Sequence, residues 1–308
     1  MNPSHKDHRR GTLYMLLVIA IWGTFLPVGK SALEMVDPYW LSAMRFGTAT
    51  CAFIGLLWMQ EGLGALRTEG HLAKVALFGG VGFAVFGICM FEGLRLTRPE
   101  ISAMILALGP IQIVLFEWWK TGRRPDRFTQ AAIALAMVGE LLVITAGDIT
   151  RLRGGDALGN GLMFIASLCW TMYALGGQQF PGWSPLRYST LSCAMGLGAI
   201  LVGLAIATLV GHSTPPRPDQ LLAVWPQLAF LMLVVSVLGI LFWNMAVAKI
   251  GPLNAGLIGS FAPVITYLIA LAQGRRPATL ELTGAAIVLI ALVANNRHQG
   301  AKASRLAV

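Results

Sequence analysis

The chain has 308 residues, of which 56% are apolar and 12% are charged, and its mean hydropathy is +0.68. A soluble globular protein carries about 25% charged residues, so this composition excludes a soluble domain and indicates a membrane protein. The net charge of +9 does not indicate nucleic-acid binding, because the basic residues lie mostly in short loops between apolar blocks, as membrane topology requires.

The apolar blocks have the length of membrane-spanning helices, which need about 20 residues. Lipid accepts only helices or closed barrels, and continuous apolar runs rather than alternating ones favour helices. The first run, Gly11–Leu33, is too long for a signal peptide and no cleavage site follows it, so we expect a retained first helix. Ten spans are predicted, at residues 11–33, 39–59, 74–94, 100–119, 128–146, 157–178, 187–210, 224–248, 252–272 and 279–297.

One stretch of the chain occurs twice and indicates an internal duplication. Pro99 and Pro110 are eleven residues apart, as are Pro252 and Pro263, and each copy ends in the letters GRRP. Since each half then holds five spans, an odd number, the second half must enter the membrane in the opposite direction. The prediction is an all-α polytopic membrane protein with ten transmembrane helices in two inverted five-helix repeats, residues 11–146 and 157–297, with a linker at 147–156 and tails at 1–10 and 298–308.

The distribution of Lys and Arg sets the predicted orientation. If the amino terminus is inside, the inner segments hold more Lys and Arg than the outer ones. This excess favours a multi-pass protein of the cytoplasmic (inner) membrane with both termini in the cytoplasm.

Two prolines inside the spans are the first candidate functional residues. Pro110 and Pro263 each remove a backbone hydrogen bond and leave the carbonyl four residues earlier without its donor. In lipid that carbonyl needs another donor or a water-filled cavity beside it. A kink tolerated for packing is the simpler interpretation for one proline, but two at equivalent positions of inverted halves favour bends that line a cavity and act as hinges.

Aromatic residues form the second candidate group. Trp22 and Phe25 in the first span, and Trp170 and Tyr173 in the sixth, are three residues apart, so each pair shares a helix face. An aromatic central pocket would suit an apolar or aromatic solute and could also stack on a cation, whereas packing between helices is the competing interpretation. The third and eighth spans add Phe91, Phe242 and Trp243.

Polar residues inside the spans are the third group, because ionisable side chains are costly in a bilayer and are usually paired or functional. Arg45 and Glu92 lie near the outer ends of adjacent spans, and we predict that they form a structural charge pair. For Glu140, a partner on another span and a proton-coupling role both stay open. Asn244 could hydrogen-bond a solute or a neighbouring helix. The predicted cavity residues are Trp22, Phe25, Phe91, Glu92, Trp170, Tyr173, Phe242, Trp243 and Asn244.

Catalytic and metal-binding patterns are missing from the sequence. The four cysteines lie inside apolar blocks without a CxxC pair, and the five histidines lie in loops or tails. No Walker loop, nucleophile elbow or paired-aspartate motif occurs. The sequence therefore predicts no enzyme activity, no metal and no cofactor. An intramembrane enzyme would need clustered acids or histidines at one membrane face, and a channel would need a polar-lined pore.

The chain resembles the EamA-type members of the drug/metabolite transporter superfamily. The matching residues are AIWGTFLPVGK in the first span, WLSAMRF in the second, and the proline-centred ILALGPIQIVL and IGSFAPVITYLIAL, each followed by a closing helix. Two features depart from the family's pattern. Arg123 and Arg275 stand where the family often has an acidic residue, and Ser192 occupies the second-half position equivalent to Arg45. We therefore do not apply to this chain any charge-based mechanism of the family that relies on those positions.

The resemblance implies a central cavity lined by spans 1–4 and 6–9, with spans 5 and 10 at the periphery. It also implies a secondary transporter that exports small metabolites, amino acids above all. The aromatic pairs favour aromatic or hydrophobic amino acids, as in exporters of the YddG type, moved by alternating access about a midplane site. The alternative is another solute of the superfamily, such as a drug cation, a sugar or a nucleotide sugar. Proton coupling and a monomeric or dimeric state stay open.

Overall fold

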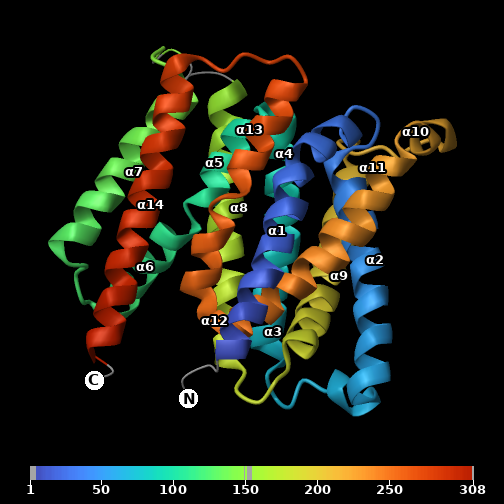
Figure 1. Cartoon of the computed structure of the whole chain (residues 1–308). Helices are drawn as coiled ribbons and strands as arrows, with labels where there is room; N and C mark the ends of the chain where they lie inside the picture. The colour runs from blue at the N-terminus through green and yellow to red at the C-terminus, as the bar shows by residue number, and fades with distance from the viewer. Residues whose placement is uncertain (1–4, 149, 151–154, 307–308) are drawn as a thin grey trace.

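The computed structural model describes residues 5–148, 150 and 155–306, and within these residues the chain is built from helices without strands (Figure 1). Eight of the described helical segments are long and apolar enough to cross a membrane, and two shorter apolar helices, Ala262–Ala272 and Thr279–Asn295, bring the described spans to the ten that the sequence predicts. The predicted polytopic all-α membrane fold is therefore confirmed.

The two halves repeat the same series of elements. In each half the third span contains a π-helical segment, Gly80–Val85 or Phe230–Gly239, and the fourth span is interrupted at a proline. The first half contains α1 (His5–Ala32), α2 (Pro38–Glu61), α3 (Leu72–Gly79), α4 (Phe86–Leu96), α5 (Pro99–Ala107), α6 (Gly109–Thr121) and α7 (Arg127–Thr145). The second half contains α8 (Gly155–Gly176), α9 (Pro185–Leu209), α10 (Pro218–Ala223), α11 (Trp225–Ala229), α12 (Ile240–Gly259), α13 (Ala262–Ala272) and α14 (Thr279–Leu306).

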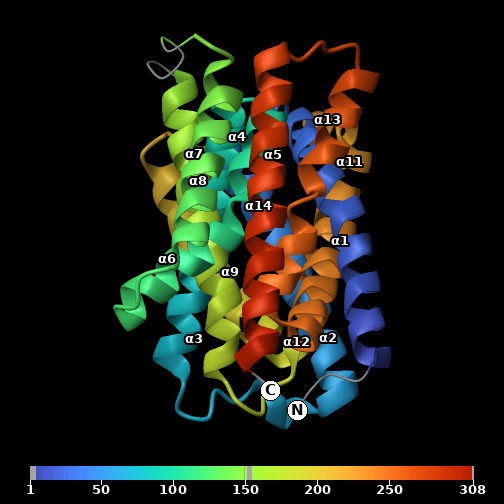
Figure 2. The same ribbon diagram turned by 60° about the vertical axis from the view of Figure 1, so that its left-hand side comes forward.

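The halves run in opposite directions. In Figure 1, α1 starts at the lower end of the bundle and rises, whereas α8, the first helix of the second half, starts at the upper end and descends. The first described helix, α1, begins and the last, α14, ends at the lower end of the bundle in Figures 1 and 2. This is the arrangement that five spans per half impose.

Several spans begin where the sequence supplies a cap. The Asp37 carboxylate accepts hydrogen bonds from the backbone N–H groups of Tyr39 and Trp40 at the start of α2. Asp126 caps α7 and Ser184 caps α9 in the same way. Such caps satisfy amide donors that the first helical turn leaves open, so they define where the spans start.

Glycines let specific helices touch at their backbones. A Cβ added to Gly139 of α7 would lie 2.8 Å from the carbonyl oxygen of Gly284 in α14, and one added to Gly284 would lie 2.6 Å from that of Gly139. Helix association in lipid depends on such close approach. The α7–α14 pair stands together at one edge of the bundle, away from α2 and α9 (Figure 1).

Candidate functional site

The two proline breaks have the same local geometry. After Pro110 the backbone N–H of Ile111 donates to Leu108 O at 2.9 Å, and after Pro263 that of Val264 donates to Phe261 O at 3.1 Å. Both bonds span three residues instead of four, so each break is a short tightened turn. As a result the Ala107 carbonyl does not accept from Ile111, its ordinary helical donor.

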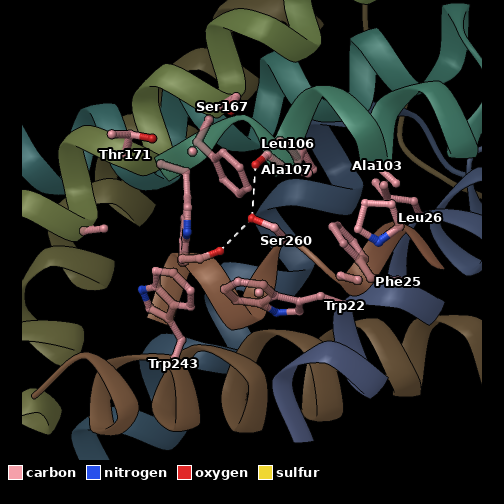
Figure 3. Close-up of a pocket in the computed structure, with 18 of the residues that line it drawn as sticks. Trp22, Phe25, Leu26, Ala103, Leu106, Ala107, Ser167, Thr171, Trp243 and Ser260 are labelled. Atoms are coloured by element: carbon pink, nitrogen blue, oxygen red, sulfur yellow. Dashed lines mark hydrogen bonds between the residues drawn. The ribbon is translucent and has the colours of Figure 1, made fainter. Parts of the chain in front are cut away.

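The breaks contact each other across the two halves. The hydroxyl of Ser260, in the second break, lies 3.3 Å from Ala107 O and 2.8 Å from Gly256 O, and the two carbonyls share its single proton (Figure 3). Next to this contact Pro110 packs over Gly256, where an added Cβ would lie 3.4 Å from the proline ring. The carbonyl that the first break leaves open therefore takes its donor from the second break.

A cavity of about 120 Å³ adjoins the two breaks, and its walls are mostly apolar. Both prolines line it, together with side chains from α1, α2, α4, α5, α6, α8, α12 and α13. Among the described residues that line it, none comes from α7 or α14. The lining residues include Trp22, Phe25, Arg45, Phe46, Phe86, Pro110, Ser167, Trp170, Thr171, Trp243, Ser260 and Pro263.

Three indole rings form the centre of the cavity wall. The Trp22 ring lies 5.3 Å from the Trp170 ring and 5.2 Å from the Trp243 ring, and the latter two are 5.9 Å apart. They come from α1, α8 and α12, and Figure 3 shows Trp22 and Trp243 side by side near Ser260. The Nε1 atoms of Trp170 and Trp243 are buried without a hydrogen-bond partner.

A buried polar cluster lies where α6 meets α8. Ser167 and Thr171 donate their hydroxyls to the Gln112 Oε1 atom at 3.1 and 2.8 Å. All three residues are buried, and the Nε2 atom of Gln112 has no partner. Ser167 and Thr171 line the cavity, so this cluster adds polar groups to its mostly apolar walls.

The predicted charge pair between Arg45 and Glu92 is wrong. Glu92 pairs with Arg95, one helical turn along α4, at 2.8 Å, and its other oxygen lies 3.6 Å from the His212 Nε2 atom. Arg45 instead extends into the cavity wall, where its Nε donates to the Ser236 hydroxyl at 2.9 Å. The two side chains point in different directions from neighbouring helices, α2 and α4. The order of the helices along the chain does not predict these directions.

Five of the nine predicted cavity residues do not line the cavity. The Asn244 amide donates to the Tyr173 hydroxyl at 2.8 Å and to the Ser189 hydroxyl at 2.7 Å, so it joins helices instead. Phe242 stacks on Tyr14, with ring centroids 5.7 Å apart. The five residues are Phe91, Glu92, Tyr173, Phe242 and Asn244.

Trp22, Phe25, Trp170 and Trp243 do line the cavity, as do Pro110 and Pro263. The prediction missed Ser167 and Thr171, although the sequence held a signal for them. Ser167 lies three residues before Trp170 and four before Thr171, so it shares a helix face with each of them. Arg45 was expected to be a structural residue and not part of the wall.

An ion-pair network lies at the end of the bundle that the sequence predicts to face outside. Glu281 of α14 lies 2.7 Å from Arg98 and 3.1 Å from Arg275, and Arg275 also pairs with Glu100 of α5. Nearby, the Lys30 ammonium donates to the carbonyls of three residues at the end of α4, Leu94, Arg95 and Thr97, at 2.8 to 3.0 Å. The network ties the two halves together at this end.

A smaller cluster lies at the opposite end of the bundle. Arg187 of α9 pairs with Glu69, in the loop before α3, at 2.9 Å, and the Trp183 indole donates to the same carboxylate at 3.0 Å. These hydrogen bonds, that of Arg187 first, hold the pKa of Glu69 below its usual value. Within the described residues no group of three His, Cys, Asp or Glu side chains is placed to hold a metal ion.

The model of the EamA-like transporter family matches residues 9–145 and, a second time, residues 157–297. The chain belongs to the EamA-like transporter family. The resemblance predicted from the sequence is confirmed, and the cavity between the two matched segments is the candidate solute site of an EamA-like transporter.

Relatives of this EamA-like transporter cover nearly its whole length. It is 32% identical to the uncharacterized transporter YrdR of Bacillus subtilis (strain 168), over 94% of this chain and 92% of the relative. It is 24% identical to a probable terminal-alkyne amino-acid exporter of Streptantibioticus cattleyicolor, over 92% of each chain. A crystal structure shares the fold with a TM-score of 0.66 and 20% identity, over 92% of this chain and 94% of that one.

Proposed function

We propose that this EamA-like transporter exports amino acids with aromatic or hydrophobic side chains across the cytoplasmic membrane by alternating access. The observation that carries the proposal is the cavity in which three indoles face two proline breaks from opposite halves. Indole rings bury apolar and aromatic groups and stack on them favourably. The relative named as a probable amino-acid exporter supports this choice of solute.

The proposed movement is rocking of residues 11–146 against residues 157–297, hinged at Pro110 and Pro263. The Ser260 hydroxyl is bonded across the hinge, and the network around Glu281 is bonded across the outer end. Opening at the outer end would require the network to break, while the two short turns could bend without losing further helical hydrogen bonds. Both termini lie in the cytoplasm in this proposal.

The test is counterflow of radiolabelled phenylalanine in proteoliposomes that contain the purified chain. Phenylalanine, methionine and leucine should exchange, while threonine, a nucleotide sugar and a cationic dye should not. Repeating the assay with and without a pH gradient separates proton antiport from facilitated diffusion. Exchange of the nucleotide sugar or the dye without phenylalanine would replace the proposed solute with the superfamily alternatives.

A matched pair of variants tests the role of the indoles. Trp22→Ala should weaken phenylalanine exchange at least tenfold, because it removes a ring that contacts both other indoles. Trp119→Ala removes an identical side chain that is 80% exposed at the end of α6, so exchange should stay unchanged. Equal effects of the two variants would mean that Trp22 packs between helices and does not contact the solute.

A further inference from the structure

The positive charge of Arg45 has no acidic partner among the residues that the structure describes. Its side chain is 2% exposed, and within the described residues no carboxylate lies within ion-pair distance of it. The Ser236 hydroxyl accepts from Nε, and that hydroxyl in turn donates to Leu231 O at 2.8 Å in the π-helical segment. One terminal nitrogen of the guanidinium, Nη1, is buried without any hydrogen-bond partner.

Aromatic rings surround this guanidinium in place of an acid. Its central carbon lies 4.6 Å from the centre of the Phe25 ring, 4.9 Å from that of Phe91 and 5.1 Å from that of Phe46. Cation–π contacts offset part of the cost of burying a charge, but they supply no hydrogen-bond acceptor. A buried cation without an acid is expensive in a membrane, and its ordinary explanation is a partner that arrives with function.

The open nitrogen belongs to a residue of the cavity wall. Arg45, Phe25 and Phe46 line the same cavity as the three indoles. An anionic group that enters the cavity would therefore meet one unpartnered, desolvated donor in an apolar surrounding. A guanidinium in that position suits a planar carboxylate, which accepts charge-assisted hydrogen bonds from it.

We propose that Arg45 binds the carboxylate of the transported solute, while the apolar body of the solute packs against Trp22, Trp170 and Trp243. This inference rests on the proposed transport of apolar solutes and narrows their class to those that carry a carboxylate. It excludes organic cations, because an ammonium group would share the cavity with an uncompensated guanidinium. In an amino acid the ammonium is offset by its own carboxylate.

The experiment measures equilibrium binding of radiolabelled 3-phenylpropanoate to the full chain purified in detergent. Phenylalanine and 2-phenylethylamine serve as competitors, so the three probes share one ring and differ only in their charged groups. The wild-type chain should bind the acid and the amino acid and not the amine. Arg45→Met should weaken binding of 3-phenylpropanoate at least tenfold and strengthen binding of radiolabelled 2-phenylethylamine at least tenfold.

The gain of amine binding separates this result from a failure to fold, since a misfolded chain gains no ligand. Arg45→Lys, which keeps the charge, should retain part of the acid binding. Arg217→Met is the matched control, because it removes the same charge from an exposed position at the start of α10 and should leave binding unchanged.

Three results would overturn the inference: acid binding by Arg45→Met within twofold of wild type, wild-type binding of the amine as tight as that of the acid, or no wild-type binding of any probe. Different results would contradict the two proposals, amino-acid export and the carboxylate site at Arg45. If the acid binds through Arg45 but phenylalanine neither competes nor exchanges in liposomes, amino-acid export is wrong and the carboxylate site stands. If phenylalanine is exchanged equally well by Arg45→Met, export stands and the carboxylate site is wrong.

Discussion

The network around Glu281 offers the sharpest test of how the two halves are held together. The Glu281 side chain is 3% exposed and accepts from Arg98 and Arg275, whose side chains are 38% and 24% exposed. Glu281→Gln removes the charge but keeps the shape, and it leaves two arginines and Glu100 in an unbalanced cluster. We expect the variant to weaken both the fold and the closure of the outer end.

The expected loss of unfolding free energy in Glu281→Gln depends on how deeply its partners are buried. Removing one member of a fully buried ion pair costs about 3–5 kcal/mol. Both arginines are partly exposed and water can stabilise them after the change, so we expect about 2 kcal/mol. The control is Asp219→Asn, which breaks a pair with Arg217 at 3.5 Å whose side chains are 72% and 70% exposed, and which should cost less than about 0.5 kcal/mol.

The assay is the free energy of unfolding from reversible denaturation in SDS and lipid bicelles, measured for wild type and both variants. A double-mutant cycle with Arg98→Met should show a coupling of about 1 kcal/mol between Arg98 and Glu281. Losses for Glu281→Gln and Asp219→Asn that agree within about 0.5 kcal/mol would refute the reasoning, because burial would then have no effect on the strength of the pair.

Three further predictions concern other contacts. Ser260→Ala should cost about 0.6–1 kcal/mol by the same unfolding assay and alter the exchange rate, whereas Ser102→Ala, whose buried hydroxyl has no partner, should not destabilise. Gly284→Ala should destabilise, because its Cβ would meet the α7 backbone at 2.6 Å, whereas Gly161→Ala, with open space around it, should stabilise by up to about 1 kcal/mol. The lowered pKa of Glu69 means that its contribution to stability is complete above the unfolded pKa, about 4.3, and is lost as the pH falls through the folded value. Glu69→Gln should therefore flatten stability against pH below about pH 5, and an unchanged pH profile would contradict this.

Much of the fold could be predicted from the sequence because it depends on local and periodic features. The spans follow from runs of apolar residues, their starts from caps such as Asp37 and Ser184, and the breaks from the positions of Pro110 and Pro263. An odd number of spans per half then leaves only one topology, with the halves inverted. Each of these inferences needs only neighbours in the chain or a count along it.

The rotation of each helix about its axis, which decides the face that meets the cavity, could not be predicted from the sequence. Tyr173 is three residues from Trp170, yet only Trp170 lines the cavity, and Asn244 bonds between helices although Trp243 beside it faces the indoles. Each of these helices is apolar on several faces, so the sequence pattern could not say which face meets the cavity. Packing against the neighbouring helices decides it.

The sequence by itself determined the number of spans, their inversion and the two proline breaks, because these depend on the chain near each residue. Only the tertiary structure decided where the Arg45 side chain lies. Its expected partner Glu92 is paired with Arg95, and its guanidinium lies among rings from α1, α2 and α4 at the cavity. Those three helices are separate along the chain, and only their packing brings the rings together around the guanidinium.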